Sequence, residues 1–252
     1  MSASLLLFAW LLPLLLALLP PRRLGPLALL AAPAAAFAAL LWLAPGQQLE
    51  LSWLLLGTEL SLDETGYWFL LASALLWQIA AVQRLLLPDS PRVASLGQRL
   101  FLLAMAGNFL LVLAADARTF YFGFALMGLS AYGLIIGRRS QQARHAGRLY
   151  LIWTLAGELA LFLALVLSAI QAESLRFADL AVTPLPTTAL LLLLFGFGIK
   201  LALPGLHFWM PAAYAAAPAT AAAVLSGPMF SAGLLGLLRF LPPGQPGLAA
   251  WS

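Results

Sequence analysis

The chain has 252 residues, of which 63% are hydrophobic and 9% are charged, with a formal net charge of +4. Soluble domains carry about 25% charged residues, and no water-soluble fold of this length buries so much apolar surface, so the composition indicates a polytopic membrane protein. The basic excess then describes membrane orientation and not a nucleic-acid surface. The absence of cysteine excludes disulfides and thiolate metal sites, and two histidines far apart in sequence do not indicate a metal site.

Apolar runs long enough to cross a bilayer recur along the whole chain. A spanning helix needs about 20 apolar residues, and helices are expected because lipid offers no partner to open strand edges. We therefore predict an all-α fold with about eight spans, at residues 4–19, 25–44, 67–87, 98–115, 119–137, 147–170, 185–204 and 219–241. The first run has no basic residue before it and "PPRRLG" after it, which indicates an uncleaved span with its amino terminus outside.

The loops between these spans alternate in charge. The odd-numbered loops hold nine arginines and one acid, namely Arg22, Arg23, Arg84, Arg92, Arg99, Arg138, Arg139, Arg144, Arg148 and Asp89. The even-numbered loops hold mostly acids, namely Glu50, Glu59, Asp63, Glu64, Asp116, Glu173 and Asp179, with Arg118 and Arg176. Because cytoplasmic loops are enriched in basic residues, we expect the odd loops in the cytoplasm and both termini outside. The longest loop, about 45–66, contains the amphipathic piece "LELSWLLLG" between two turn signals.

Few ionisable residues remain at membrane depth once the loops are assigned. Glu158 lies in the middle of the sixth span, and Lys200, the single lysine of the chain, lies inside the seventh. A charge at mid-bilayer costs about 2.5–3.5 kcal/mol on insertion scales, so such residues need a partner, a wet cavity or a change of protonation state. Burial favours the neutral form of both groups. A proton relay between them is one interpretation, and a structural pair that locks two helices is the other.

A helix break follows Lys200 and makes the seventh span discontinuous. Pro204, Gly205 and Pro211 interrupt the helix, and Gly196 and Gly198 precede the lysine. Unpaired carbonyls at membrane depth occur only where protein or water satisfies them, and broken helices with a central ion site recur in transporters. A proline kink that serves packing alone is the alternative.

Two further polar residues lie near the break and at the end of the last span. His207 could relay protons, or it could bridge backbone groups that the break leaves unpaired. We expect Arg239 to snorkel to the outer interface.

The stretch "KLALPGLHFWMPAAYAAAPATAAAVLSGPMFSAGLLGLLRF" resembles the signature of the proton-translocating antiporter-like membrane subunits. These subunits occur in respiratory complex I, Mrp-type cation/proton antiporters and membrane-bound hydrogenases. The residues in register are Lys200, Pro204, His207, Trp209, Pro211, Ala217, Pro218, Leu225, Ser226, Gly227, Gly233 and Arg239. The segments "LGTELSLDETGYWFLL" and "DARTFYFGFALMGLSAYGLII" are also similar to the third and fifth span regions of the family.

The resemblance implies a division of the chain. The family has about fourteen helices with two inverted five-helix repeats, and spans four to eight form the first repeat. This chain would then hold the amino-terminal half only: residues 1–97 as spans one to three, 98–241 as one five-helix half-channel repeat, and 242–252 as a short tail.

The chain departs from the family pattern at several polar positions. Ala125 stands where the fifth span usually has a glutamate, and Ser231 stands at the lysine of the eighth span. Tyr214 replaces a histidine, Thr220 a proline and Leu235 a tyrosine. The usual glutamate–lysine pair is therefore broken unless Glu158, one helix further on, replaces the missing carboxylate.

By this resemblance the chain is a membrane subunit that provides a proton or cation/proton half-channel in a larger complex of the complex I, Mrp or hydrogenase type. Lys200 would be the switching base, Glu158 its charge partner and His207 a relay. The expected partners are other membrane subunits, among them a chain that supplies the second half-channel, in a bacterial-type inner membrane. We find no cofactor motif and no catalytic site of the chain's own. The alternatives are a non-conducting structural or assembly subunit, and the membrane partner of an inorganic-carbon uptake complex.

Overall fold

The structure is a computed structural model that describes residues 4–19, 26–54, 57–87 and 91–241. Apolar runs dominate the chain, and most of them form helices, in which backbone polar groups bond to one another. The helices are α1 (Ser4–Leu18), α2 (Pro26–Ala31), α3 (Ala34–Trp42), α4 (Glu64–Leu86), α5 (Pro91–Leu113), α6 (Ala117–Ile135), the 3₁₀ turn η1 (Ile136–Arg138), α7 (Gln141–Ala172), α8 (Phe177–Val182), α9 (Thr187–Lys200), α10 (Trp209–Ala216), α11 (Ala219–Ser226) and α12 (Pro228–Phe240).

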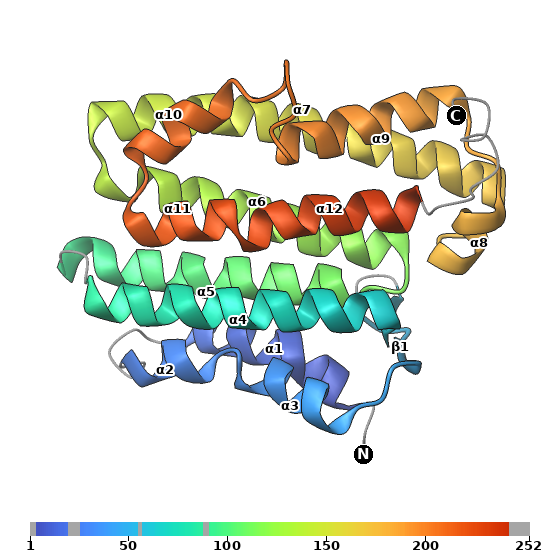
Figure 1. Ribbon diagram of the computed structural model, residues 1–252, viewed down its shortest axis with the longest axis horizontal. Helices are drawn as coiled ribbons and strands as arrows, with labels where there is room; N and C mark the ends of the chain where they lie inside the picture. Colours follow the sequence, from blue (N-terminus) through green and yellow to red (C-terminus); the bar gives the residue numbers. More distant parts are fainter. Residues whose placement is uncertain (1–3, 20–25, 55–56, 88–90, 242–252) are drawn as a thin grey trace.

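The long helices lie side by side in an elongated bundle whose connections gather at two ends (Figure 1). At one end α4 meets α5, α6 meets α7 and α10 meets α11; the strands and α8 lie at the other end. The arginine-rich odd loops and the acidic even loops therefore separate, as the charge pattern predicts. Which end faces the cytoplasm stays a prediction. Arg22, Arg23, Asp89 and the predicted tail 242–252 lie outside the described residues.

The number of membrane spans is confirmed only in part. Five helical segments are long and apolar enough to cross a membrane: Glu64–Leu86, Leu96–Leu113, Ala117–Arg138, Gln141–Ala172 and Ala219–Phe240. Three shorter apolar segments, Ser4–Leu18, Leu27–Trp42 and Thr187–Lys200, lie at the other predicted positions. The count of eight, the five-helix repeat and the three-part division of the chain stay predictions.

Two predicted spans are interrupted where the sequence analysis expected continuous helices. The span at 25–44 divides into α2 and α3, with Pro33 at the start of α3. The span at 219–241 divides at Gly227, which ends α11 and precedes Pro228 at the first position of α12. Each proline lacks the N–H that would bond to the preceding turn, so each ends one helical segment and starts the next.

An antiparallel hairpin replaces the amphipathic piece predicted in the longest loop. Strand β1 (Gln47–Leu51) pairs with β2 (Thr58–Leu62), and Gln47 lies opposite Leu62. Arg176, in the connection between α7 and α8, joins this hairpin through Glu50 at 2.7 Å and Glu59 at 2.9 Å. Hydrogen bonding to Glu59 and the charges of both carboxylates raise the pKa of Arg176. The all-α prediction is therefore wrong for this loop. The outer edge of β2 is satisfied by the connection between α5 and α6: the Glu59 N–H donates to Asp116 Oδ2 at 3.0 Å, and the Glu59 carbonyl accepts from the Ala115 N–H at 2.9 Å.

A buried asparagine joins four helices inside the bundle. Asn108 in α5 accepts a hydrogen bond from Trp77 Nε1 of α4 at 2.9 Å, and its amide donates to the Pro228 carbonyl of α12 at 3.2 Å. The same amide lies 3.6 Å from Met127 Sδ in α6. Pro228 is the first residue of α12, so Asn108 ties the start of this helix to α4, α5 and α6 through one connected set of contacts.

We expect Asn108→Ala to destabilise the folded protein by about 1–2 kcal/mol, because it leaves the Trp77 N–H without its partner. Thermal unfolding of the detergent-solubilised protein measures this change. Ser168→Ala is the matched control, since Ser168 is also buried but its hydroxyl group donates to the Ala164 carbonyl, one turn earlier in its own helix. Equal losses from both variants would contradict a role for Asn108 between helices.

Candidate functional site

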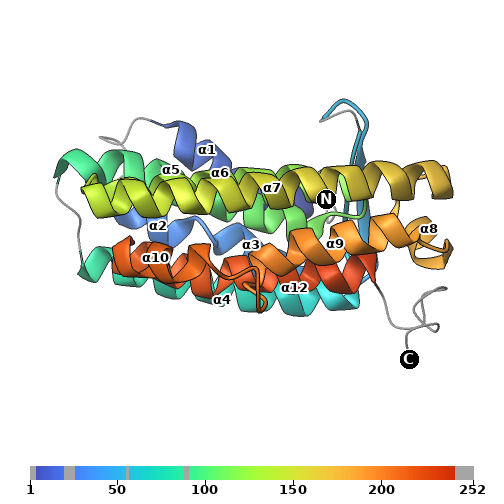
Figure 2. The same ribbon diagram turned by 90° about the horizontal axis from the view of Figure 1, so that it is seen from above.

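Two glycines bring α7 and α9 into close contact at the level of the predicted site. A Cβ on Gly196 would lie 2.8 Å from the Gly157 carbonyl oxygen and 2.5 Å from Leu161 Cγ, so α9 accepts no side chain there. Figure 2 shows the two helices lying side by side. This approach places Glu158 of α7 and Lys200, the last residue of α9, on neighbouring helices.

Glu158 and Lys200 converge on one position of a third helix. A Cβ built on Gly128 of α6 would lie 2.5 Å from Glu158 Oε1 and 3.1 Å from Lys200 Nζ. The two side chains are buried, with relative exposures of 6% for Glu158 and 7% for Lys200. The sequence could not show that the two residues meet; the structure brings them together at Gly128, where the missing side chain leaves room for both.

In the described part of the chain, one oxygen of the acid and the amine of the base have no direct hydrogen-bond partner. Among the described residues, Glu158 Oε1 and Lys200 Nζ both lack a hydrogen bond, and no ion pair joins them. The ammonium group lies 4.6 Å from the centre of the Phe124 ring, which offers a weak cation–π contact. Buried polar groups are normally satisfied, so this acid and this base are held near each other without being locked.

A tyrosine and a tryptophan fix the surroundings of the pair. Tyr150 donates from its hydroxyl to the Gly128 carbonyl at 3.0 Å, and Trp209 donates from Nε1 to the Ile199 carbonyl at 2.9 Å. The two rings meet edge to face with centroids 5.3 Å apart. The sequence analysis missed Tyr150; its spacing of eight residues before Glu158, which puts both on one face of a helix, was the available signal.

The helix break lies directly behind Lys200, as predicted. Helix α9 ends at Lys200, and the chain loops out through residues 201–208 before α10 begins (Figure 1). Ala202 and Gly205 take positive φ values of 51° and 85° in this connection. Lys200 therefore lies at a helix carboxyl terminus, where the helix dipole favours a cation. The carbonyls of Phe197, Gly198 and Ile199 in this last turn accept hydrogen bonds from the loop that follows.

The prediction for Pro211 needs correction. This proline does not break the helix but lies in the first turn of α10, which begins at Trp209. Backbone N–H groups in a first turn have no partner within the helix, so proline is tolerated there. The interruption itself contains Pro204 and Gly205, both exposed.

The remaining candidates lie apart from the acid–base pair. His207 is half-buried and stacks on Phe208 with centroids 5.1 Å apart. Tyr214 is half-buried in α10, and Ser231 donates to the Pro228 carbonyl of its own helix at 2.9 Å. Within the described part of the chain, no hydrogen bond or ion pair links any of the three to Glu158 or Lys200.

Arg239 reaches the acidic end of the bundle but does not extend into water there. Its Nη2 lies 3.0 Å from Asp63 Oδ1 and donates to the Val112 carbonyl, also at 3.0 Å. The guanidinium group lies over the Phe177 ring at 5.2 Å, and the residue is 9% exposed. The snorkelling interpretation is therefore wrong, because Asp63 lets this charge be buried between helices as half of an ion pair.

Fold and site together define a polytopic helical membrane protein that buries an acid and a base beside a broken helix. In the described segments no three His, Asp or Glu side chains gather as metal ligands. Residues 114–251 match the family described as "NADH:quinone oxidoreductase/Mrp antiporter, TM". The chain belongs to this family, and the resemblance stated from its sequence is confirmed.

The chain is also similar to two curated proteins of different enzymes. The chain is 37% identical over 134 residues to Hydrogenase-4 component B of Escherichia coli (strain K12), covering 51% of this chain and 20% of that protein. It is 36% identical over 163 residues to NADH-quinone oxidoreductase subunit N of Desulforudis audaxviator (strain MP104C), covering 60% of this chain and 32% of that protein.

The fold is also similar to a chain of the membrane-bound sulfane sulfur reductase, an archaeal respiratory membrane complex. The TM-score is 0.81 at 21% identity, and the match covers 99% of this chain and 55% of that one. The chain thus spans about half of this neighbour, and its matches span a third or less of the two curated relatives. The two curated relatives are named as a component and a subunit of larger enzymes, and the chain is similar to part of each.

Proposed function

We propose that the chain provides a proton half-channel in a larger ion-translocating complex of the complex I, Mrp or hydrogenase type. Lys200 is the switching base, and Glu158 is the charge partner that sets whether Lys200 holds its proton. His207, half-buried in the break, exchanges that proton with water or with the next carrier. The partners in this proposal are other membrane subunits of a bacterial-type inner membrane, one of which supplies a second half-channel.

One observation carries the proposal: Glu158 and Lys200 meet at Gly128 while neither has a direct hydrogen bond among the described residues. A structural pair would be expected to close into an ion pair, because an uncompensated buried charge is costly. Because no ion pair closes between them, Glu158 and Lys200 are able to exchange protons with water that enters through the helix break.

The position of Glu158 also accounts for the missing carboxylate of the fifth span. Ala125 precedes Gly128 by one helical turn in α6, so the two positions share a face. Glu158 reaches this face from α7. We infer that it supplies from the neighbouring helix the negative charge that the family usually carries at position 125.

The test is Glu158→Gln in the assembled complex. We expect substrate-driven proton uptake by membrane vesicles to fall roughly tenfold, which corresponds to about 1.4 kcal/mol of lost charge interaction with Lys200. A pH-sensitive fluorescent dye records the uptake. Glutamine keeps the size of the side chain, so the loss reports the charge.

Glu173→Gln is the matched control, because Glu173 ends the same helix α7 but is exposed. It should leave uptake unchanged. If Glu158→Gln also leaves uptake unchanged in a complex that assembles normally, the chain is a non-conducting structural or assembly subunit instead. If the chain copurifies with a zinc-containing soluble protein of inorganic-carbon uptake and with no ion-translocating complex, the assignment to such a complex is wrong.

A further inference from the structure

A separate cavity lies at the arginine-rich end of the bundle, away from the acid–base pair. Residues of α4, α5, α6 and α11 and of the turn after α6 line it, and its volume is about 140 Å³. A single buried water needs roughly 10–15 Å³ on this measure, so the cavity accommodates a group much larger than one water. The proposed proton relay uses none of these residues.

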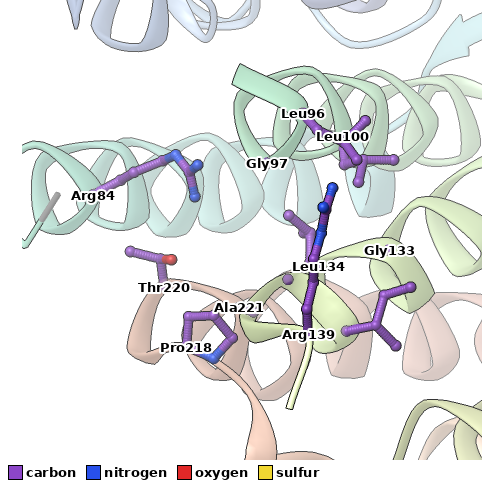
Figure 3. A pocket seen from close by; sticks show the side chains of 12 residues that line it. Arg84, Leu96, Gly97, Leu100, Gly133, Leu134, Arg139, Pro218, Thr220 and Ala221 are labelled. Atoms are coloured by element: carbon purple, nitrogen blue, oxygen red, sulfur yellow. The ribbon is translucent and has the colours of Figure 1, made fainter. Parts of the chain in front are cut away.

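Two arginines line this cavity. Arg84 comes from α4 and Arg139 from the turn that follows η1, and Figure 3 shows both side chains reaching toward the first turns of α5. Arg84 is only 7% exposed, and a Cβ on Gly97 would lie 2.6 Å from its Nη2, so the glycine leaves room for the guanidinium group. Arg139 is exposed and is held at a positive φ of 53°. No acidic side chain is among the described residues that line the cavity.

The start of α11 adds further hydrogen-bond donors to the cavity. Helix α11 starts at this cavity, with Pro218, Thr220 and Ala221 in its lining. The backbone N–H groups of the first turn have no partner within the helix, and no side chain caps them. Two guanidinium groups, a hydroxyl group and a helix amino terminus on one cavity form a set of donors that suits a phosphate group.

We propose that this cavity binds an anionic phosphate group, either that of a phospholipid headgroup or a free phosphate ester. The position of the cavity favours the lipid headgroup. In the proposed arrangement, the loops at the arginine-rich end lie where the bundle leaves the hydrocarbon layer. Basic pockets between membrane helices on the cytoplasmic side are suited to acidic lipid headgroups. The apolar members of the lining, such as Leu96 and Leu100, would then contact the glycerol and acyl part.

The test measures thermal unfolding of the complex in detergent that is titrated with phosphatidylglycerol, phosphatidylcholine or inorganic phosphate. We expect phosphatidylglycerol to raise the unfolding temperature and phosphatidylcholine to have no effect. Arg139→Gln should raise the concentration for half of this shift by at least about tenfold, the loss expected for one charge-assisted contact. If inorganic phosphate alone gives the same shift with the same dependence on Arg139, the bound group is a free phosphate.

Arg138→Gln is the matched control, since Arg138 is the exposed neighbour in sequence and does not line the cavity. This variant removes one positive charge from the same end of the bundle. It should change the phosphatidylglycerol concentration for half of the shift by less than about twofold. Equal weakening in Arg138→Gln and Arg139→Gln would show a diffuse surface attraction and overturn the proposal. A shift that survives Arg139→Gln unchanged, or the absence of any shift with either phosphate source, would overturn it as well.

Discussion

Replacing Lys200 by methionine is expected to reduce proton uptake about 100-fold, close to the level of vesicles that lack the complex. Proton transfer by a positioned side chain typically contributes about 10²–10⁴-fold. Methionine fills a similar volume without a titratable group, and the space at Gly128 and Phe124 that now holds the amine is largely apolar. The same dye assay in the assembled complex measures the loss, and the amount of complex in the membrane is measured in parallel.

Lys200→Arg separates charge from proton exchange. Arginine keeps the positive charge near Glu158 but stays protonated in proteins, so it cannot serve as a switching base. We expect this variant to assemble and still to show strongly reduced uptake. If Lys200→Arg retained full uptake, a fixed cation would suffice, and the proposed role of Lys200 as a proton carrier would be wrong.

The helical segments and their separation into two charged ends could be predicted from sequence because their signals are local. Long apolar runs and clustered arginines do not depend on tertiary packing. The hairpin at Gln47–Leu62 could not be predicted in this way, since its strands are held by each other and by Arg176, more than 100 residues further along the chain. The division at Gly227 and Pro228 had a local signal, but its stabilising partner Asn108 lies in another helix.

The residues of the site could be predicted from the sequence, but their arrangement in space could not. Glu158 and Lys200 stand out because charges are rare in apolar runs. Their meeting at Gly128 depends on the close approach of Gly157 and Gly196, which no spacing rule within one helix can give. The environment of Arg239 was misjudged for the same reason, because its partner Asp63 lies 176 positions earlier in the sequence.

Removing the Asp63 carboxylate is expected to destabilise the bundle more than Asn108→Ala does, because Asp63 makes both a helix cap and an ion pair. Asp63 Oδ1 accepts from the Gly66 N–H at 2.9 Å and so caps α4, and the same oxygen pairs with Arg239 at 3.0 Å. Asp63→Ala should lower the free energy of unfolding by about 2–3 kcal/mol: about 1 kcal/mol for the cap and about 1–2 kcal/mol for the charged contact. The charged contact with Arg239 contributes no more than this because the Asp63 side chain is 48% exposed and partly solvated.

Two variants separate these contributions in thermal or denaturant unfolding of the solubilised protein. Asp63→Asn keeps an oxygen that can cap the helix but removes the charge, so it should give the second part of the loss alone. Glu64→Ala removes the adjacent exposed acid and should change stability by less than about 0.5 kcal/mol. If Asp63→Asn is as stable as the wild type, the charge of Arg239 is satisfied by the Val112 carbonyl and by solvent, and the Asp63–Arg239 ion pair contributes nothing to the stability of the bundle.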